Sequence, residues 1–226
     1  MLSRVLSIAT LLFMLSCGSE NKTDSKEKIE EKKDTASVID QKEEQKVILF
    51  FGNSITAGYQ LDLDDAFPAL IQNKIDAAGY NYKTINAGLS GETSAAGKNR
   101  IGWVLQTVPD IFFLELGAND GLRGLKLEET PKNLQAIIDA VKKENPDVQI
   151  IVAGMMVPPN LGAEYAKEFQ QVFSVLADEN NATLVPFLLE NVAGNPELNL
   201  SDGIHPTAEG HEIVAETVWR YLEPML

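Results

Sequence analysis

The chain has 226 residues, of which 44% are hydrophobic and 23% charged, proportions that suit one globular domain with an appendage. Its 19 basic and 33 acidic residues give a net charge of −14, which argues against nucleic acid as a partner because phosphate binding requires clustered Lys and Arg. A single cysteine excludes an intramolecular disulfide, and with two histidines the chain lacks the ligands of a usual structural zinc site.

The first sixteen residues have the layout of a secretory signal. Arg4 precedes an apolar stretch over residues 5–15, which gives way to Ser16-Cys17-Gly18. Eleven residues rise only about 16 Å as a helix, too short to span a bilayer core of about 30 Å. A basic flank, a short apolar run and small residues are typical of a signal peptide, which we expect over residues 1–16.

Cys17 stands where cleavage of this signal would fall. The layout resembles a bacterial lipoprotein signal, in which the cysteine becomes the lipidated first residue; the alternative is a plain signal peptide with an incidental thiol. Residues 18–46 contain seven Lys and nine acidic residues, and too few apolar side chains to offset the entropy of ordering. We therefore expect a disordered, charged tether over 17–46 that holds a domain over 47–226 at a bacterial envelope membrane, on the periplasmic side or the cell surface.

Five short and almost continuously apolar runs predict strands covered on both faces, as parallel strands are. They span residues 47–51, 82–86, 111–116, 149–154 and 183–185. Amphipathic stretches between and after them predict helices over 64–78, 93–106, 130–144, 163–179 and 207–222. This alternation predicts an α/β fold, with three α/β/α layers around a five-stranded parallel sheet and right-handed crossovers.

Two of these helices carry local start signals. Pro68 lies in the first turn of the helix over 64–78, where proline is tolerated. The helix over 130–144 begins with Thr130 as a cap and Pro131 at the first helical position. In doubly wound sheets, functional loops lie outside the carboxyl ends of the strands, so we expect the functional residues of this chain to lie there.

Four short blocks fall on strand ends or late loops: GNSITAG (52–58), GLSGETS (88–94), ELGANDG (115–121) and SDGIHP (201–206). Each alone is compatible with ordinary turn chemistry. Together they supply an acyl-transfer site, because the Ser54 hydroxyl needs a base and His205 can act as one. Asp202, three residues earlier across a flexible Gly203, can reach the imidazole and set its tautomer. His211 lies beside two glutamates in the last helix, and we expect a surface or helix-packing role for it.

The reaction also requires donors for a developing oxyanion. The backbone N–H groups of Ser54 and Gly91 and the side-chain amide of Asn119 follow three different strands and can supply them. Residues 52–56 do not form the Gly-x-Ser-x-Gly elbow, so the pattern does not favour an α/β-hydrolase.

The four blocks, in this order, resemble the SGNH/GDSL hydrolase family over residues 47–225. The stretches FGNSITAGY, LSGETS, LELGANDGLRG and DGIHPTAEGH are similar to its lysophospholipase L1, acyl-CoA thioesterase I and arylesterase branch. This resemblance implies a flavodoxin-like fold and hydrolysis through a seryl-acyl intermediate, with Ser54, His205 and Asp202 as the triad. It also implies an oxyanion hole of Ser54, Gly91 and Asn119, and no metal or cofactor.

The chain departs from the family pattern at Asn53, where the family usually has an aspartate that braces the loop. Asn offers similar reach without the charge, which puts loop geometry and pH response in question more than the chemistry. Asp120 is then the remaining acid near the site, and we favour a turn role for it in Asn-Asp-Gly.

The substrate should be a small acyl ester or a lysolipid, and we expect it to meet an apolar wall. Candidates for this wall follow the third and fourth strands: Leu122, Met156, Val157, Pro158 and Leu161. The methionines could equally end the core strand. Two alternative functions stay open: a carbohydrate O-deacetylase on the same scaffold, and a non-catalytic binding lipoprotein. The oligomeric state does not follow from the sequence, although we favour a monomer.

Overall fold

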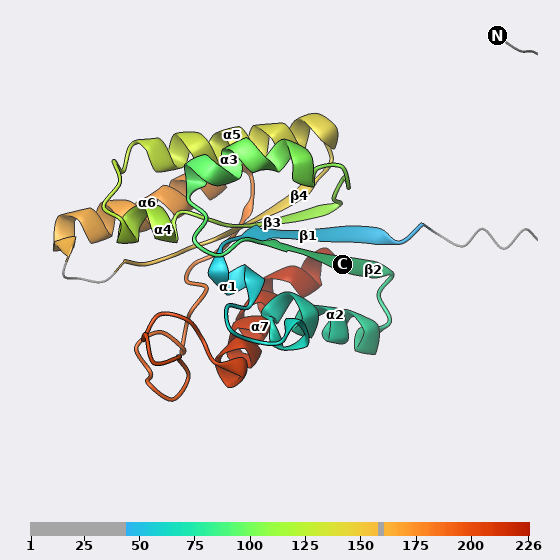
Figure 1. Cartoon of the computed structure of the whole chain (residues 1–226). Helices are drawn as coiled ribbons and strands as arrows, with labels where there is room; N and C mark the ends of the chain where they lie inside the picture. Colours follow the sequence, from blue (N-terminus) through green and yellow to red (C-terminus); the bar gives the residue numbers. More distant parts are fainter. Residues whose placement is uncertain (1–43, 158–160) are drawn as a thin grey trace, which may run out of the picture. The chain divides into compact units, whose positions relative to one another are not determined.

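The computed structural model describes residues 44–157 and 161–226, so the expected signal peptide, Cys17, the tether up to residue 43 and Pro158 lie outside the described residues. Within these ranges, five parallel strands form one sheet in the order β2-β1-β3-β4-β5 (Figure 1). This is the flavodoxin-like order, and it confirms the predicted fold class. The strands are β1 (Lys46–Gly52), β2 (Tyr82–Gly88), β3 (Ile111–Glu115), β4 (Gln149–Ala153) and β5 (Thr183–Val185).

Helices cover both faces of the sheet (Figure 1). One face carries α3 (Ser94–Val104), α5 (Glu129–Glu144) and α6 (Ala163–Asn180), and the other carries α2 (Phe67–Ala78) and α7 (Ala208–Leu222). Short helices are α1 (Ser54–Ala57), α4 (Ala118–Leu122), η1 (Leu63–Asp65) and η3 (Glu223–Met225). In the described part of the chain, no helix has both the length and the apolarity that crossing a membrane requires.

The core lies between the sheet and its two helical layers. Four consecutive β1 side chains, Ile48 to Phe51, are fully buried, and so are the first three of β3, Ile111 to Phe113. The rings of Phe50, Phe67 and Phe113 pack with centroids 5.1–5.8 Å apart. Continuous apolar runs are therefore buried on both faces, which is why these strands show no alternation in the sequence.

The prediction that Thr130 caps α5 is wrong. The helix begins at Glu129 with Glu128 as its N-cap, and Thr130 lies inside the first turn with its side chain buried. Its hydroxyl donates to the Asp120 carboxylate at 3.4 Å instead of to its own helix terminus. A tertiary partner thus replaces the local cap that the Thr-Pro pattern indicated.

His211 has the helix-packing role and not the surface one. It is buried in α7, its Nδ1 accepts a hydrogen bond from the Phe67 backbone N–H at 3.1 Å, and its ring stacks on that of Phe67. The imidazole therefore joins α7 to the start of α2. Burial, together with the nearby His205, lowers the pKa of His211 to about 4.

Glu115, the last residue of β3, is a second buried ionisable group. Burial raises its pKa to about 7, although hydrogen bonds from Thr56 and Asn53 act in the opposite direction. The two shifts have opposite consequences for stability. The folded state resists protonation of His211, so stability rises with pH between about 4 and 6.5, whereas it retains the proton of Glu115, so stability falls between about 4.5 and 7.

We expect the variants His211→Asn and Glu115→Gln to separate these opposing contributions. The difference in free energy of unfolding between the wild type and His211→Asn should shift in favour of the wild type by up to about 3 kcal/mol from pH 4 to pH 7. The reason is that the variant lacks the titrating group. The difference between the wild type and Glu115→Gln should shift against the wild type by a similar amount over the same range. Urea unfolding followed by circular dichroism measures both differences, and parallel pH profiles for all three proteins would contradict the assignment.

Candidate active site

Three strands end at the same level at the carboxyl edge of the sheet. In the pairing register, Gly52 of β1 lies opposite Gly88 of β2 and opposite Glu115 of β3. The loops that follow these strands therefore start side by side, at the point where the strand order reverses between β1 and β3. Such a switch point is where doubly wound sheets bind ligands.

The structure brings Ser54, His205 and Asp202 together in one hydrogen-bonded chain. Ser54 is the first residue of α1, directly beyond β1, and its Oγ lies 2.9 Å from His205 Nε2. His205 Nδ1 lies 2.7 Å from Asp202 Oδ2. These distances allow the hydroxyl to pass its proton to the imidazole while the carboxylate holds the other nitrogen.

The loop carrying His205 is shaped by its own backbone. Asp202 Oδ1 accepts the N–H groups of Ile204 and His205 at 2.9 and 3.0 Å, and Gly203 has a left-handed φ of 69° that closes the turn. The His205 carbonyl accepts the Leu200 N–H at 2.7 Å. The histidine is thereby aimed before any substrate arrives.

Asp202 is ionised at neutral pH. The Ile204 backbone N–H, followed by the side chain and backbone N–H of His205, lowers the pKa of Asp202 to about 2. The imidazole also packs against Tyr59, whose ring centroid lies 4.5 Å from that of His205. Sequence reasoning did not assign a role to Tyr59, although it ends the quoted block FGNSITAGY.

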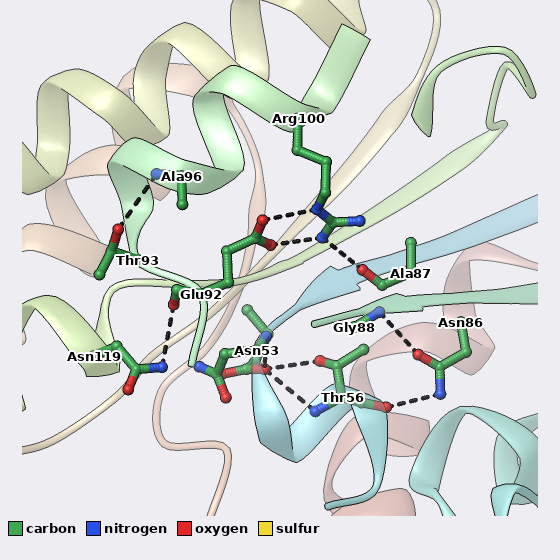
Figure 2. A network of polar contacts seen from close by, with 11 residues as sticks. Asn53, Thr56, Asn86, Ala87, Gly88, Glu92, Thr93, Ala96, Arg100 and Asn119 are labelled. Atoms are coloured by element: carbon green, nitrogen blue, oxygen red, sulfur yellow. Dashed lines mark hydrogen bonds and ion pairs between the residues drawn. The ribbon is translucent and has the colours of Figure 1, made fainter. Parts of the chain in front are cut away.

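The three candidate oxyanion donors come from the ends of β1, β2 and β3. Among residues 44–157 and 161–226, no acceptor pairs with the backbone N–H of Ser54 or of Gly91, where φ is 80°. The Asn119 side chain donates to the Glu92 carbonyl at 3.1 Å, as Figure 2 shows, which leaves its second N–H available. Arg123 donates to the Gly91 carbonyl at 2.8 Å and ties the two loops together.

A buried ion pair anchors the loop that carries Gly91. Arg100 of α3 binds both carboxylate oxygens of Glu92 at 2.7 and 2.5 Å and also donates to the Ala87 carbonyl at 2.8 Å (Figure 2). Its guanidinium lies over the ring of Phe51, 4.4 Å from the centroid. The bidentate geometry holds the loop against α3.

Asn53 binds a residue that sequence reasoning missed. Its side-chain amide donates to Glu115 Oε1 at 2.5 Å, and its side-chain oxygen accepts the Ile55 N–H at 3.0 Å. A charged residue inside the apolar run IFFLELG was the available signal, since a strand covered on both faces buries every side chain.

Asp120 is bound by residues of the neighbouring helices. Its carboxylate accepts the backbone N–H of Ser94 at 2.8 Å and the hydroxyls of Ser94 and Thr130, so it links α3, α4 and α5. It is more than the turn residue expected from Asn-Asp-Gly, although the backbone turn is present as well, with its N–H donating to the Gly117 carbonyl.

The candidate substrate residues divide by exposure. Leu122, Met156 and Leu161 are each about 40% exposed and belong to connections beyond the carboxyl ends of β3 and β4. Val157 is 7% exposed and packs where Gly121 lacks a side chain, so little of its surface can meet a substrate. In the described ranges, no cluster of three or more His, Cys, Asp or Glu side chains could hold a metal ion.

Comparison with known proteins identifies the family. Residues 50–213 match the model of the GDSL-like lipase/acylhydrolase family. The esterase TesA of Pseudomonas aeruginosa is 34% identical over 190 residues, which cover 84% of this chain and 94% of the relative. The arylesterase of Vibrio mimicus is 36% identical (76% and 85% covered), and the thioesterase 1/protease 1/lysophospholipase L1 of Escherichia coli is 33% identical (79% and 84% covered).

Solved structures agree with the sequence comparison. The crystal structure of TesA superposes with a TM-score of 0.77 at 35% identity and covers 80% of this chain and 100% of its own. The SGNH-hydrolase family esterase AlinE4 superposes with a TM-score of 0.67 at 41% identity, covering 81% and 97%. The family that the four blocks predict is confirmed: the chain belongs to the GDSL-like lipase/acylhydrolase family.

Proposed function

We propose that this protein is a serine hydrolase that cleaves acyl esters through a seryl-acyl intermediate, with Ser54, His205 and Asp202 as its catalytic triad. The hydrogen-bonded chain from the Ser54 hydroxyl through both His205 nitrogens to Asp202 carries the proposal. Ser54 Oγ attacks the carbonyl carbon while His205 Nε2 takes its proton, and the ionised Asp202 stabilises the resulting imidazolium. His205 then protonates the departing alkoxide or thiolate, and later activates the water that releases the acid.

The tetrahedral intermediate carries its negative charge on the former carbonyl oxygen. The backbone N–H groups of Ser54 and Gly91 and the second amide N–H of Asn119 are the donors we assign to it. The absence of protein acceptors for the two backbone groups in the described ranges supports this role. Their positions are held by Arg123 and the Glu92–Arg100 pair, so few atoms have to reorganise as the charge develops.

The substrate we propose is an ester or thioester with an acyl chain of several carbons, or a lysolipid. Exposed apolar side chains at the carboxyl edge support an apolar acyl group: Leu89, Leu122, Met156, Leu161 and Ile204. Relatives named arylesterase and thioesterase 1/lysophospholipase L1 support the same range of leaving groups. We propose that Met156 and Leu161 form one side of the acyl site and Leu122 the other.

Replacement of the nucleophile tests the reaction. We expect Ser54→Ala to abolish hydrolysis of p-nitrophenyl esters, because no other described hydroxyl is hydrogen-bonded to His205. Steady-state rates on acetate, butyrate and octanoate esters should also show a preference for the longer chains in the wild type. Hydrolysis by Ser54→Ala at the wild-type rate would exclude the mechanism, and strict selection of acetate would favour O-deacetylation instead.

Asn119→Ala tests the oxyanion assignment. We expect kcat to fall about 100- to 1,000-fold with little change in KM, because the donor is engaged mainly in the transition state. The variant Asn119→Asp keeps the size of the side chain but cannot donate, and should lose as much. A large rise in KM at unchanged kcat in either variant would instead assign Asn119 to ground-state binding.

We also propose that the protein is exported and anchored to a bacterial envelope membrane through a lipid on Cys17. The signal layout before Cys17 and the charged, apolar-poor segment behind it support this. A tether of this composition would let the domain reach substrates near the membrane surface, and stable anchoring would require two or more acyl chains.

Metabolic labelling tests the anchor. Cells that express the full chain should incorporate radioactive palmitate into the wild type and into Ser54→Ala, which keeps the signal but lacks the proposed nucleophile. Cys17→Ser should abolish labelling, because the thiol is the acceptor of the lipid. Equal labelling of Cys17→Ser would refute the proposal.

A further inference from the structure

Glu115 is a buried carboxylate surrounded by donors from the residues that flank Ser54. It is fully inaccessible to solvent. Its Oε1 accepts the Asn53 side-chain amide at 2.5 Å, and its Oε2 accepts the Asn53 backbone N–H at 2.9 Å. Oε2 also accepts the Thr56 hydroxyl at 2.8 Å and the Thr56 N–H at 3.4 Å. All four donors are neutral, and no Lys or Arg within residues 44–157 and 161–226 forms an ion pair with this carboxylate.

The carboxylate reaches these donors only because Gly52 has no side chain. A Cβ at position 52 would lie 2.5 Å from Glu115 Oε2 and 2.1 Å from Thr56 Oγ1. Figure 2 shows Asn53 and Thr56 close together at the start of α1. The turn that presents Ser54 is therefore closed around the end of β3, with one residue on each side of the serine bound to the same carboxylate.

This contact determines which way the Asn53 amide faces. When Glu115 is ionised, above its pKa of about 7, its carboxylate only accepts, so the NH₂ group of Asn53 points to Glu115 and the amide oxygen points the other way. That oxygen accepts the Ile55 N–H at 3.0 Å and a longer hydrogen bond from the Ser54 hydroxyl at 3.3 Å, for which His205 Nε2 at 2.9 Å is the nearer acceptor. Were the amide reversed, its NH₂ group would face the Ile55 N–H and would donate toward the serine hydroxyl, in competition with attack.

We propose that Glu115 is a positioning residue for the nucleophile: its carboxylate orients the Asn53 amide so that only acceptors face the Ser54 hydroxyl, and it holds the turn over residues 53–56 that aims Ser54 at His205. The inference rests on the proposed function, because it assumes that Ser54 is the nucleophile. Retaining a buried carboxylate without a cation is costly for folding, and the gain is the alignment of the reacting hydroxyl.

Exchange of the amide and the carboxylate tests this role. In Glu115→Gln, the single amide oxygen is required by the three donors at Oε2, so the new NH₂ group faces that of Asn53 and the Asn53 amide has to turn. In Asn53→Asp, which introduces the aspartate that the family usually has at this position, the two acids share one proton, so that one donor and one acceptor still face each other. In the double variant, the new amide at position 115 donates to the new carboxylate at position 53, whose second oxygen again accepts the Ile55 N–H.

We expect Glu115→Gln to lower kcat on a p-nitrophenyl ester about 10- to 100-fold and Asn53→Asp to lower it less than about fivefold, since an aligned nucleophile matters mainly in the chemical step. KM should change less than about threefold in both variants. The double variant should recover to within about fivefold of the wild type. The rate at which a p-nitrophenyl phosphonate labels the serine should follow the same order. Urea unfolding of each protein shows that it is folded under the assay conditions.

Two results would overturn the inference: losses of kcat that multiply in the double variant, or full activity in Glu115→Gln. If Glu115 only filled the core, a change at position 53 would not restore the activity lost in Glu115→Gln. If Glu115→Gln does not fold alone, recovery of a folded and active protein when Asn53→Asp is added carries the same test. Ser54→Ala separates the two proposals. Activity that persists in Ser54→Ala removes the proposed function, whereas an inactive Ser54→Ala beside a fully active Glu115→Gln removes only the role of Glu115.

Discussion

The alignment of three strand ends is the constraint on which the rest of the site depends. Gly52, Gly88 and Glu115 share one level in the parallel sheet, so the chain leaves β1, β2 and β3 at neighbouring points. Bringing together segments that are far apart in the sequence costs conformational entropy. The backbone hydrogen bonds of the sheet offset that cost, because they already fix the three strand ends side by side. Only His205 and Asp202 arrive by another route, on the long connection from β5 to α7.

Each loop is then held by a polar group buried behind it. Glu115 binds the turn around Ser54, the Glu92–Arg100 pair holds the loop of Gly91, and Asp120 links the helix after Asn119 to α3 and α5. The three carboxylates differ in how they are compensated: by neutral donors, by a guanidinium, and by the N–H and hydroxyls of neighbouring helices. A buried and hydrogen-bonded acid therefore lies behind each of the loops that carry Ser54, Gly91 and Asn119. Burying an acid costs folding free energy, and the gain is a fixed loop geometry.

Much of the fold was predictable because its strands are buried on both faces. The runs over 47–51 and 111–116 are apolar for that reason, and their predicted bounds differ from β1 and β3 by one residue at the ends. The blocks around Ser54, Gly91, Asn119 and His205 could also be predicted. Together they place a hydroxyl, an imidazole and an amide on loops at the carboxyl edge, a combination that turn formation alone does not require. What the sequence could not supply was the partner of each polar group. Thr130 was predicted to cap its helix because its actual partner, Asp120, is reached only in the folded protein. The charge of Glu115 in an apolar run was a signal, but nothing local indicates that Asn53 faces it.

Ser54 and His205, the proposed nucleophile and its base, are 151 positions apart in the chain, one near the beginning of the domain and the other just before its last long helix. During synthesis, the segment that contains Ser54, Gly91 and Asn119 is finished well before His205 exists. α7 must then dock beside α2, where His211 accepts the Phe67 N–H, to seat the connection that delivers the imidazole. A chain that ends before this connection would carry the proposed nucleophile and oxyanion donors but not the proposed base. The proposed chemistry therefore depends on the packing of α7, the last long helix to be synthesised.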